Sequence, residues 1–372
     1  MSRPRVVIVG LGDTGVLTAI TVGKFADVVG ITSKPEFVSG QELGLRLARP
    51  QAWEKDYRIA YSRFRGLDRT RIVHGSATGL DTEARLVRVT RADGSIIEEP
   101  FDLVVVATGV TNGFWRHPTL QDATGLDTDL GSPHQRIAAA SSVAVIGGGA
   151  AALSAAAQIA ERWPTTEVNL YFPGDRALPH HHDRVWQQVQ SRLVRLGVGL
   201  RPGHRAVPPP DHGTHQLTGE PVTWSTGQPP TSADVVLWAI GRVTPNTGWL
   251  PDEVLDDRGF VAVEPTLQVT GHPEVFAVGD VAATDPLRTS ARNRGHVLLA
   301  RNIRAHLTGA PLHDYRPPPR RWGSVLGPQR DGLIVFAPTG QGVRVPARAS
   351  DVVLQRLITR QGIYGGVRRR PR

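Results

Sequence analysis

Short runs of apolar residues alternate along this chain with longer alanine-rich or amphipathic stretches. A continuous apolar run of four to six residues is typical of a strand buried on both faces of a parallel sheet. Two of these runs, at 5–9 and 142–146, lead through a glycine turn into a helical pattern. Because strand–helix alternation starts afresh at each turn, the pattern predicts two Rossmann-like, doubly wound α/β units with mainly parallel sheets.

The remaining pattern predicts several further elements. Further buried strands are expected near 27–31, 104–106, 167–172, 235–239 and 275–278, with helices near 182–196 and 289–307. Residues 112–138 are interpreted as a connection, and the Pro/Gly/His-rich stretch 202–231 as a loop or edge hairpin. The last 50 residues suggest a small α+β region, a strand pair and a helix, with "GPQRDG" as the turn.

The two glycine turns are candidate dinucleotide cradles. The first has Gly10, Gly12 and Gly15 in G-x-G-x-x-G spacing, with Thr14 inside the turn. In this fingerprint the first glycine permits the tight turn, the second lets a diphosphate approach the backbone, and the third lets helix and strand pack closely. The second turn has Gly147, Gly149 and Ala152 at the same positions. One such motif is weak evidence, but two of them between a strand and a helix predict two dinucleotide sites.

Neither unit has the acidic residue that the fingerprint expects at the end of its second strand. Thr32 and Phe172 stand there instead, so the usual carboxylate contact to a ribose hydroxyl is absent. Arg176, four residues past Phe172, is a candidate contact for a 2′-phosphate. This favours NADPH over NADH at the second site, while a solvated loop arginine remains the alternative.

Three further motifs indicate a resemblance to a known family. Strands "VVVATG" (104–109) and "VVLWAIGR" (235–242) each end in glycine at matching distances after the two turns, and "VFAVGDVA" (275–282) follows. With the turns, this set resembles the two-dinucleotide flavoprotein oxidoreductases related to glutathione reductase. It is most similar to their cysteine-free branch, which contains apoptosis-inducing-factor-like quinone reductases, type II NADH dehydrogenases and ferredoxin reductases. The resemblance covers about residues 4–310.

The resemblance implies two cofactors, FAD and either NADPH or NADH, and a set of residues that bind them. Asp280 is implied to accept a hydrogen bond from the FAD ribityl chain, and a helix opening at 290–292 to point at the flavin ring. Lys34, Val38 and Ser39 are candidates beside the flavin or the electron acceptor. The residues implied at the FAD site are Gly10, Gly12, Thr14, Gly15, Lys34, Val38, Ser39, Ala77, Thr108, Gly109, Gly279, Asp280, Ser290, Ala291 and Arg292. Those implied at the nicotinamide site are Gly147, Gly149, Ala152, Arg176 and Gly241.

The resemblance also implies a domain order. An FAD-binding domain is expected at 1–112 and 249–312, with an NAD(P)-binding domain inserted at 113–248. A small basic C-terminal domain is expected at 313–372. The chain departs from the family pattern in two respects: it has no cysteine, which excludes dithiol chemistry, and Ser154 stands where many relatives have a glutamate near the flavin. Long amphipathic C-terminal helices for membrane attachment are not evident.

Hydride transfer between stacked nicotinamide and flavin rings needs proximity rather than an acid or base, so no catalytic side chain is required. The sequence leaves the acceptor open: a quinone-like small molecule, oxygen, or an acidic protein as in ferredoxin reductases. A flavin monooxygenase ranks lower, because its usual F-x-G-x-x-x-H segment is missing. No metal site is expected.

Charge bears on the partners. The chain is formally +9, and from Arg301 onward 14 arginines stand against Asp314, Asp331 and Asp351, which leaves +11. Such a segment suits an acidic redox protein or an anionic membrane surface, although arginine bias can also reflect base composition. A nucleic-acid-binding role is the competing class, and no binding module supports it. We expect a cytoplasmic protein without a signal peptide, with peripheral membrane attachment left open; the oligomeric state is not evident.

Overall fold

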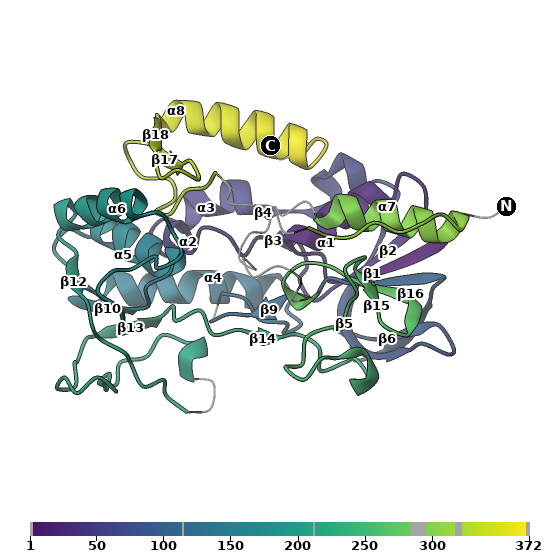
Figure 1. Ribbon diagram of the computed structural model, residues 1–372, viewed down its shortest axis with the longest axis horizontal. Coiled ribbons are helices and arrows are strands. Elements are labelled where there is room, and N and C mark those ends of the chain that lie inside the picture. Colours follow the sequence, from purple (N-terminus) through teal and green to yellow (C-terminus); the bar gives the residue numbers. More distant parts are fainter. Residues whose placement is uncertain are drawn as a thin grey trace.

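A computed structural model describes residues 3–113, 115–210, 213–282, 284, 295–316 and 322–369. Two sheets lie at opposite ends of an elongated molecule, and helices cover their faces (Figure 1). The chain forms most of the first sheet, then the whole second sheet, and then returns to complete the first. The predicted class, two doubly wound units with the second inserted in the first, is confirmed.

The first sheet has eight strands in the order β15-β16-β8-β1-β2-β5-β6-β7. Its centre, β16-β8-β1-β2-β5, is parallel, and antiparallel strands extend both edges. The apolar runs noted above form the central strands because both of their faces are covered. The strands are β1 (Arg5–Val9), β2 (Asp27–Thr32), β5 (Arg71–Asp81), β6 (Leu86–Arg91), β7 (Ile96–Pro100), β8 (Leu103–Val106), β15 (Gln268–Val269) and β16 (His272–Ala277).

Helices α1 (Asp13–Val22) and α7 (Gly295–Thr308) pack side by side on one face of this sheet. Beyond β2 the chain forms a short antiparallel pair and two helices that lead toward the second unit. These are β3 (Phe37–Val38), α2 (Leu43–Ala48), α3 (Pro50–Tyr57) and β4 (Arg58–Ile59). Short 3-10 turns follow at η1 (Tyr61–Arg63) and η2 (Arg65–Leu67), and later at η3 (Gly213–His215), η4 (Asp252–Val254) and η5 (Asp280–Ala282).

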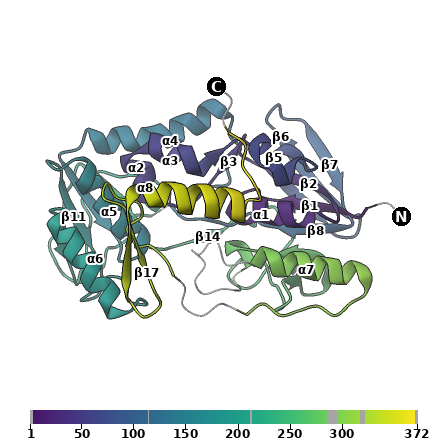
Figure 2. The same ribbon diagram turned by 90° about the horizontal axis from the view of Figure 1, so that it is seen from above.

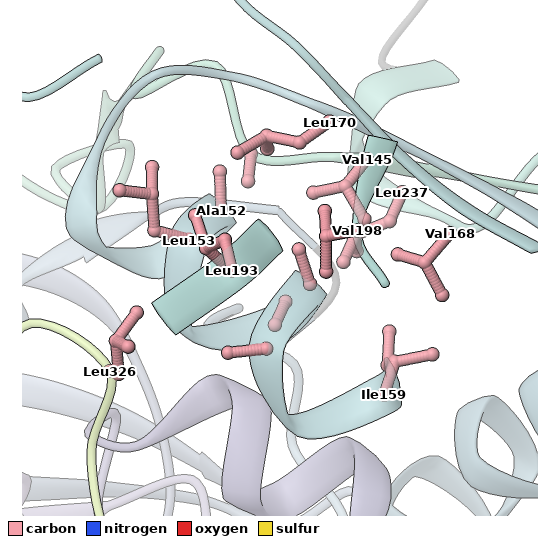
Figure 3. Packing of buried hydrophobic residues seen from close by; sticks show 14 of the residues in the cluster. Val145, Ala152, Leu153, Ile159, Val168, Leu170, Leu193, Val198, Leu237 and Leu326 are labelled. Atoms are coloured by element: carbon pink, nitrogen blue, oxygen red, sulfur yellow. The ribbon is translucent and has the colours of Figure 1, made fainter. Parts of the chain in front are cut away.

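The second sheet has four parallel strands in the order β12-β11-β10-β13. Its helix α5 is alanine-rich, which lets its backbone lie close to the strands, and Leu153 and Ile159 fill the space toward the sheet (Figure 3). Leu326, from the C-terminal part of the chain, closes the same core. The elements are β10 (Ser142–Ile146), α5 (Ala150–Arg162), β11 (Glu167–Tyr171), α6 (Asp183–Arg195), β12 (Gly199–Arg201) and β13 (Val235–Trp238).

The interpretation of residues 112–138 as a connection was wrong for its second half. Residues Ala123–Ala138 form helix α4, which Asp122 caps by accepting a hydrogen bond from the Gly125 N–H at 2.7 Å. The helix contains Gly125, Gly131 and Pro133, residues that weaken intrinsic helix propensity. Burial of Leu126, Leu130 and Ile137 stabilises it instead.

Two chain crossings join the units. Strands β9 (Val110–Thr111) and β14 (Thr244–Pro245) pair antiparallel where the chain leaves the first unit and returns to it. Helix α2 packs directly on α5: a Cβ added to Gly44 would lie 2.4 Å from the Ser154 carbonyl oxygen. The domain boundaries at residues 112, 248 and 312 fit this chain path and stay predictions.

The C-terminal region contains the expected strand pair and helix. Strands β17 (Leu333–Phe336) and β18 (Gly342–Val345) pair antiparallel, and α8 (Ala347–Ala349) continues as a π-type helix, η6 (Ser350–Ile363). The segment "GPQRDG" was predicted as the turn between the two strands, but it precedes β17. Residues 337–341 connect β17 to β18. The helix lies across the middle of the molecule (Figure 2). No helix among the described residues is long and apolar enough to cross a membrane.

Candidate functional site

The first glycine turn has the backbone geometry that a diphosphate cradle requires. Gly10 has φ +98°, and a Cβ there would lie 2.5 Å from the Ala107 carbonyl oxygen. A Cβ on Gly15 would lie 1.8 Å from the Gly10 carbonyl oxygen, whereas one on Gly12 would meet nothing within 4 Å. Gly12 is the N-cap residue of α1, and no side chain caps the backbone N–H groups at the start of this helix. The turn therefore presents open backbone at a helix N-terminus, the arrangement that binds phosphate.

The second turn repeats this geometry. Gly147 has φ +142°, and a Cβ there would lie 2.1 Å from the Ala239 carbonyl oxygen. A Cβ on Gly149, just before α5, would meet nothing within 4 Å. Ala152 is fully buried, so a small residue is required at the third position. The second turn thus presents open backbone at the N-terminus of a second helix, α5.

A cavity of about 960 Å³ opens from the first turn along the edge of the first sheet and reaches the crossing between the units. Many of the residues implied at the FAD site line it, namely Gly10, Gly12, Thr14, Lys34, Val38, Ala77, Thr108, Gly109, Gly279 and Asp280. Gly15 and Ser39 are not part of the lining. Gly15 packs helix on strand, and Ser39 is buried and donates a 2.7 Å hydrogen bond to Asp13 Oδ1.

Asn246 fixes the floor of the cavity at the crossing. Its side-chain N–H donates to the Thr108 carbonyl at 3.0 Å, its backbone N–H donates to the Gly109 carbonyl, and its Oδ1 accepts from Thr111 at 2.7 Å. Thr108 in turn donates to the Asn246 carbonyl at 2.9 Å. The sequence analysis missed Asn246. The sequences "VATGVT" (106–111) and "WAIGRVT" (238–244) are similar, and this similarity could have indicated that the two segments pair where the chain crosses between the units.

Asp280, a predicted FAD contact, and Thr32, which stands where the fingerprint expects an acid, both have protein partners. Asp280 Oδ2 accepts a 2.9 Å hydrogen bond from Arg116, and both side chains are largely buried. The Arg116 guanidinium also packs on Gly40, because a Cβ added to Gly40 would lie 2.0 Å from Arg116 Nε. Both residues line the cavity. At the end of β2, the Thr32 hydroxyl lies 3.0 Å from the Tyr61 hydroxyl. Burial raises the pKa of Tyr61, so this tyrosine stays a neutral hydrogen-bonding group.

A polar network forms another part of the cavity wall. Lys34 Nζ donates to the Thr119 carbonyl at 2.8 Å and to Gln121 Oε1, and Gln121 donates to Asp129. His117 lies 3.1 Å from the same Asp129 carboxylate. Burial lowers the pKa of Lys34 to about 8 and also lowers that of His117. Lys34 is therefore mainly protonated at pH 7 and loses its proton as the pH rises through its pKa of about 8.

Comparison with known families decides the identity of this arrangement. The family model described as pyridine nucleotide-disulphide oxidoreductase matches residues 4–302. The chain belongs to this family.

Individual relatives of this oxidoreductase are distant. Oxidoreductase ptaL of Pestalotiopsis fici is 26% identical over 257 residues, which cover 68% of this chain and 66% of that protein. The chain thus spans slightly less than two thirds of that relative. Demethylphylloquinone reductase NdbB of Synechocystis is 25% identical over 390 residues, covering 96% of this chain and 91% of that protein. The sulfide:quinone oxidoreductase of Aquifex aeolicus has the same fold, with a TM-score of 0.70, 15% identity, and coverage of 98% and 92%.

Family membership confirms the expected resemblance and the expected cofactor pair, FAD with NADH or NADPH. The residues fit FAD because the open Gly12 backbone and the α1 N-terminus lie at a cavity of about 960 Å³. They fit a pyridine nucleotide because Gly149 presents the same open helix end. Individual contacts to either cofactor stay predictions.

The nicotinamide-site residues of the oxidoreductase lie outside the cavity lining. Gly241 has φ +73° and open space around it, as expected of a residue that lies against a ligand. Arg176 forms an ion pair with Asp183, in the first turn of α6, and donates to the Pro179 carbonyl at 3.2 Å. Ser290, Ala291 and Arg292 lie outside the described residues.

Ser154, which stands where relatives have a glutamate, is buried in this oxidoreductase. Its hydroxyl donates to the Leu326 carbonyl at 3.2 Å, and Gln158, one turn along α5, donates to the Leu326 and Pro328 carbonyls. This position therefore binds the C-terminal segment to α5. Among the described residues, no cluster of three or more His, Asp or Glu side chains is arranged to hold a metal ion.

Proposed function

We propose that this protein is an FAD-dependent NAD(P)H oxidoreductase that passes electrons from the nicotinamide to a quinone-like small molecule. The observation that carries the proposal is the pair of glycine turns with the same backbone geometry, of which the first opens into a cavity of about 960 Å³. One turn suits a resident dinucleotide, and the other suits a dinucleotide that arrives and leaves.

FAD, when bound, supplies a ring that accepts hydride from the nicotinamide and then gives up electrons. The side chains and backbone of this protein position the two cofactors and supply hydrogen-bonding groups to them. The α1 and α5 N-termini bind the diphosphates through backbone N–H groups, and Asn246 keeps the Thr108–Gly109 backbone fixed along the cavity. Asp280 is the proposed acceptor for a ribityl hydroxyl, which requires Arg116 to share or release it.

Two features support a quinone-like acceptor. The chain has no cysteine, so dithiol substrates are excluded, and NdbB, which matches nearly the whole chain, is named a demethylphylloquinone reductase. The C-terminal helix also exposes the apolar side chains Val353 and Leu357, close to Arg348 and Arg356. An apolar and basic surface of this kind suits the boundary of an anionic membrane, where hydrophobic quinones dissolve. We propose a peripheral location there.

An acidic electron-transfer protein is the second candidate, and the excess of arginine after residue 300 favours it. However, several of these arginines are paired within the chain. Arg344 pairs with Asp331, Arg360 with Asp56, and Arg368 with Asp68. Internal pairing lowers the positive potential available to a partner, so this candidate ranks second.

Anaerobic reduction followed by reoxidation tests the proposal. The purified protein should be yellow, should bleach on addition of NADPH or NADH, and should recover its colour fastest with a soluble quinone. The same reduced protein is offered ferredoxin and oxygen in parallel. Failure to bind FAD would contradict the flavoprotein assignment, whereas faster reoxidation by ferredoxin would contradict the quinone-like acceptor alone.

A further inference from the structure

Two cations line the cavity, and neither belongs to a glycine turn; the resemblance gives Lys34 only as a candidate beside the flavin or the acceptor, and it gives Arg46 no role. Arg46 lies on α2 and is only 5% exposed, and Lys34 follows β2 and is half-buried. Both are part of the cavity lining. Burying a charged side chain is costly unless an opposite charge compensates it, so the partners of these two groups are informative.

Arg46 has too few partners for a buried guanidinium. Its Nη1 donates to the Trp115 carbonyl at 3.0 Å, and its guanidinium carbon lies 5.5 Å from the centre of the Trp53 ring. Its Nε is buried and has no hydrogen-bond partner. No ion pair joins it to a carboxylate in the part of the chain that the structure describes. Burial lowers the pKa of Arg46 to about 10, which shows how poorly its charge is compensated.

The positive charge of Lys34 is also incompletely compensated by its neighbours. Asp129 on α4 favours its protonated form, while Arg46 on α2 opposes it, and burial opposes it most. The nearby His117 has its pKa lowered by burial and by both cations. One carboxylate, Asp129, thus faces two cations and an imidazole, and this wall has a positive potential that an anionic ligand would relieve.

We propose that Arg46 and Lys34 form an anion-binding wall that holds the diphosphate of FAD together with the first glycine turn. The wall contributes binding free energy for FAD in place of the carboxylate–ribose hydrogen bond that the fingerprint usually supplies. Thr32, at that position, is 5% exposed and lies between Tyr61 and the Lys34 backbone. The proposal concerns FAD binding and does not depend on which acceptor the reduced protein uses.

The diphosphate is the fitting anion for two reasons. It is the charged part of the ligand whose cradle, Gly10 to Thr14, opens into this same cavity. Guanidinium groups bind phosphate oxygens through paired N–H donors, and Arg46 lines the cavity without an ion pair to a carboxylate among the described residues. An amino group at Lys34 adds a second positive charge without a fixed hydrogen-bond direction.

Binding of FAD to the apoprotein, followed by quenching of flavin fluorescence, tests Arg46. We expect Arg46→Gln to raise the dissociation constant of FAD by about 10- to 100-fold, the range of one charge-assisted contact. Arg46→Lys, which keeps the charge, should raise it less than the glutamine variant does. Arg49→Gln is the matched control: Arg49 lies three residues away, outside the cavity lining, and pairs with Glu161.

The pH dependence of the same binding tests Lys34 independently, in case the Arg46 variants do not fold. A protonated lysine binds an anion, so affinity should be highest below the pKa of about 8 in the free protein and fall as pH rises through it. We expect a several-fold rise in the dissociation constant between pH 7 and pH 9 in the wild type. Lys34→Gln should abolish most of this change, while Lys55→Gln, on the surface beside Asp351, should keep it.

Three outcomes would overturn the proposal. Arg46→Gln could bind FAD as tightly as Arg49→Gln, or Arg46→Lys could be as weak as Arg46→Gln, which would make packing rather than charge responsible. Lys34→Gln could keep the wild-type pH dependence. The proposal rests on the proposed FAD binding. None of these measurements involves an electron acceptor, so the wall can fail while FAD binding and the oxidoreductase activity stand, and the quinone-like acceptor can fail while the wall stands.

Discussion

At the scale of single residues, the two glycine turns show which positions the fold requires and which the ligand requires. Gly10 and Gly147 need a positive φ and leave no room for a Cβ against the neighbouring strand. Gly12 and Gly149 have open space where a Cβ would be. A side chain at these last two positions would therefore interfere with a ligand and not with the protein.

The contrast between Gly12 and Gly15 is testable. Gly15→Ala should destabilise the apoprotein by about 1–3 kcal/mol, because the added methyl group pushes α1 away from β1. Gly12→Ala should leave apoprotein stability nearly unchanged and weaken FAD binding at least tenfold. Chemical denaturation and FAD titration measure the two effects. Equal destabilisation by both variants would contradict the division of roles.

Arg176 allows a second prediction at this scale. The structure pairs it with Asp183, whose side chain is 75% exposed, so a 2′-phosphate competes with that carboxylate for the guanidinium. Asp183→Asn should raise kcat/KM for NADPH several-fold, and Arg176→Gln should lower it about tenfold, as loss of a charge-assisted contact would. Both should leave kcat/KM for NADH within about twofold. Parallel changes for NADH and NADPH would reject the role of Arg176 at the 2′-phosphate.

At the scale of elements, the sequence predicts best where pattern and motif coincide. The central strands, α1, α5 and α6 are where the apolar runs and glycine turns indicate, because burial on both faces dictates their composition. Helix α4 was missed because its glycines and Pro133 mask a helical pattern that only tertiary packing stabilises.

The site followed the same rule. Most residues of the first glycine turn and of the strand ends at 108–109 and 279–280 could be assigned to the cavity in advance. Arg46, Arg116 and Asn246 could not, because their importance depends on chain segments meeting across the crossing between the units. No local spacing in the sequence encodes such a meeting.

The C-terminal helix provides an element-scale prediction. Arg360 on this helix pairs with Asp56 on α3, and burial raises the pKa of Asp56 despite the pairing. Arg360→Met leaves that carboxylate without its ion-pair partner and should cost about 2–4 kcal/mol of stability, reduced for partial exposure. The double variant Asp56→Asn/Arg360→Met should recover part of this loss. Hydrogen exchange of residues 350–363 measures both, and a double variant no more stable than Arg360→Met would contradict the desolvation account.

At the scale of the whole molecule, the C-terminal helix spans the region between the two units (Figure 2). Gln355 and Arg360 bind it to α3, and Tyr364 packs against Phe37 and Phe64 of the first unit. Its other side exposes apolar residues to solvent. Because the net charge of +9 is concentrated toward this end of the chain, the helix combines apolar area with positive charge on one side of the molecule.

This combination predicts reversible binding to anionic lipid vesicles. Val353 and Leu357 are 44% and 57% exposed, and burying their remaining exposed area in an interface contributes about 1 kcal/mol each. Val353→Gln/Leu357→Gln should therefore lower vesicle co-sedimentation at least tenfold, while Ile96→Gln, at a residue 64% exposed on β7, should leave it unchanged. Raised salt should weaken wild-type binding only in part, because screening reduces the arginine contribution and not the apolar one. If the double variant sediments like the wild type while still reducing a soluble quinone, this helix is not the membrane-facing surface, and the acceptor must reach the cavity from solution.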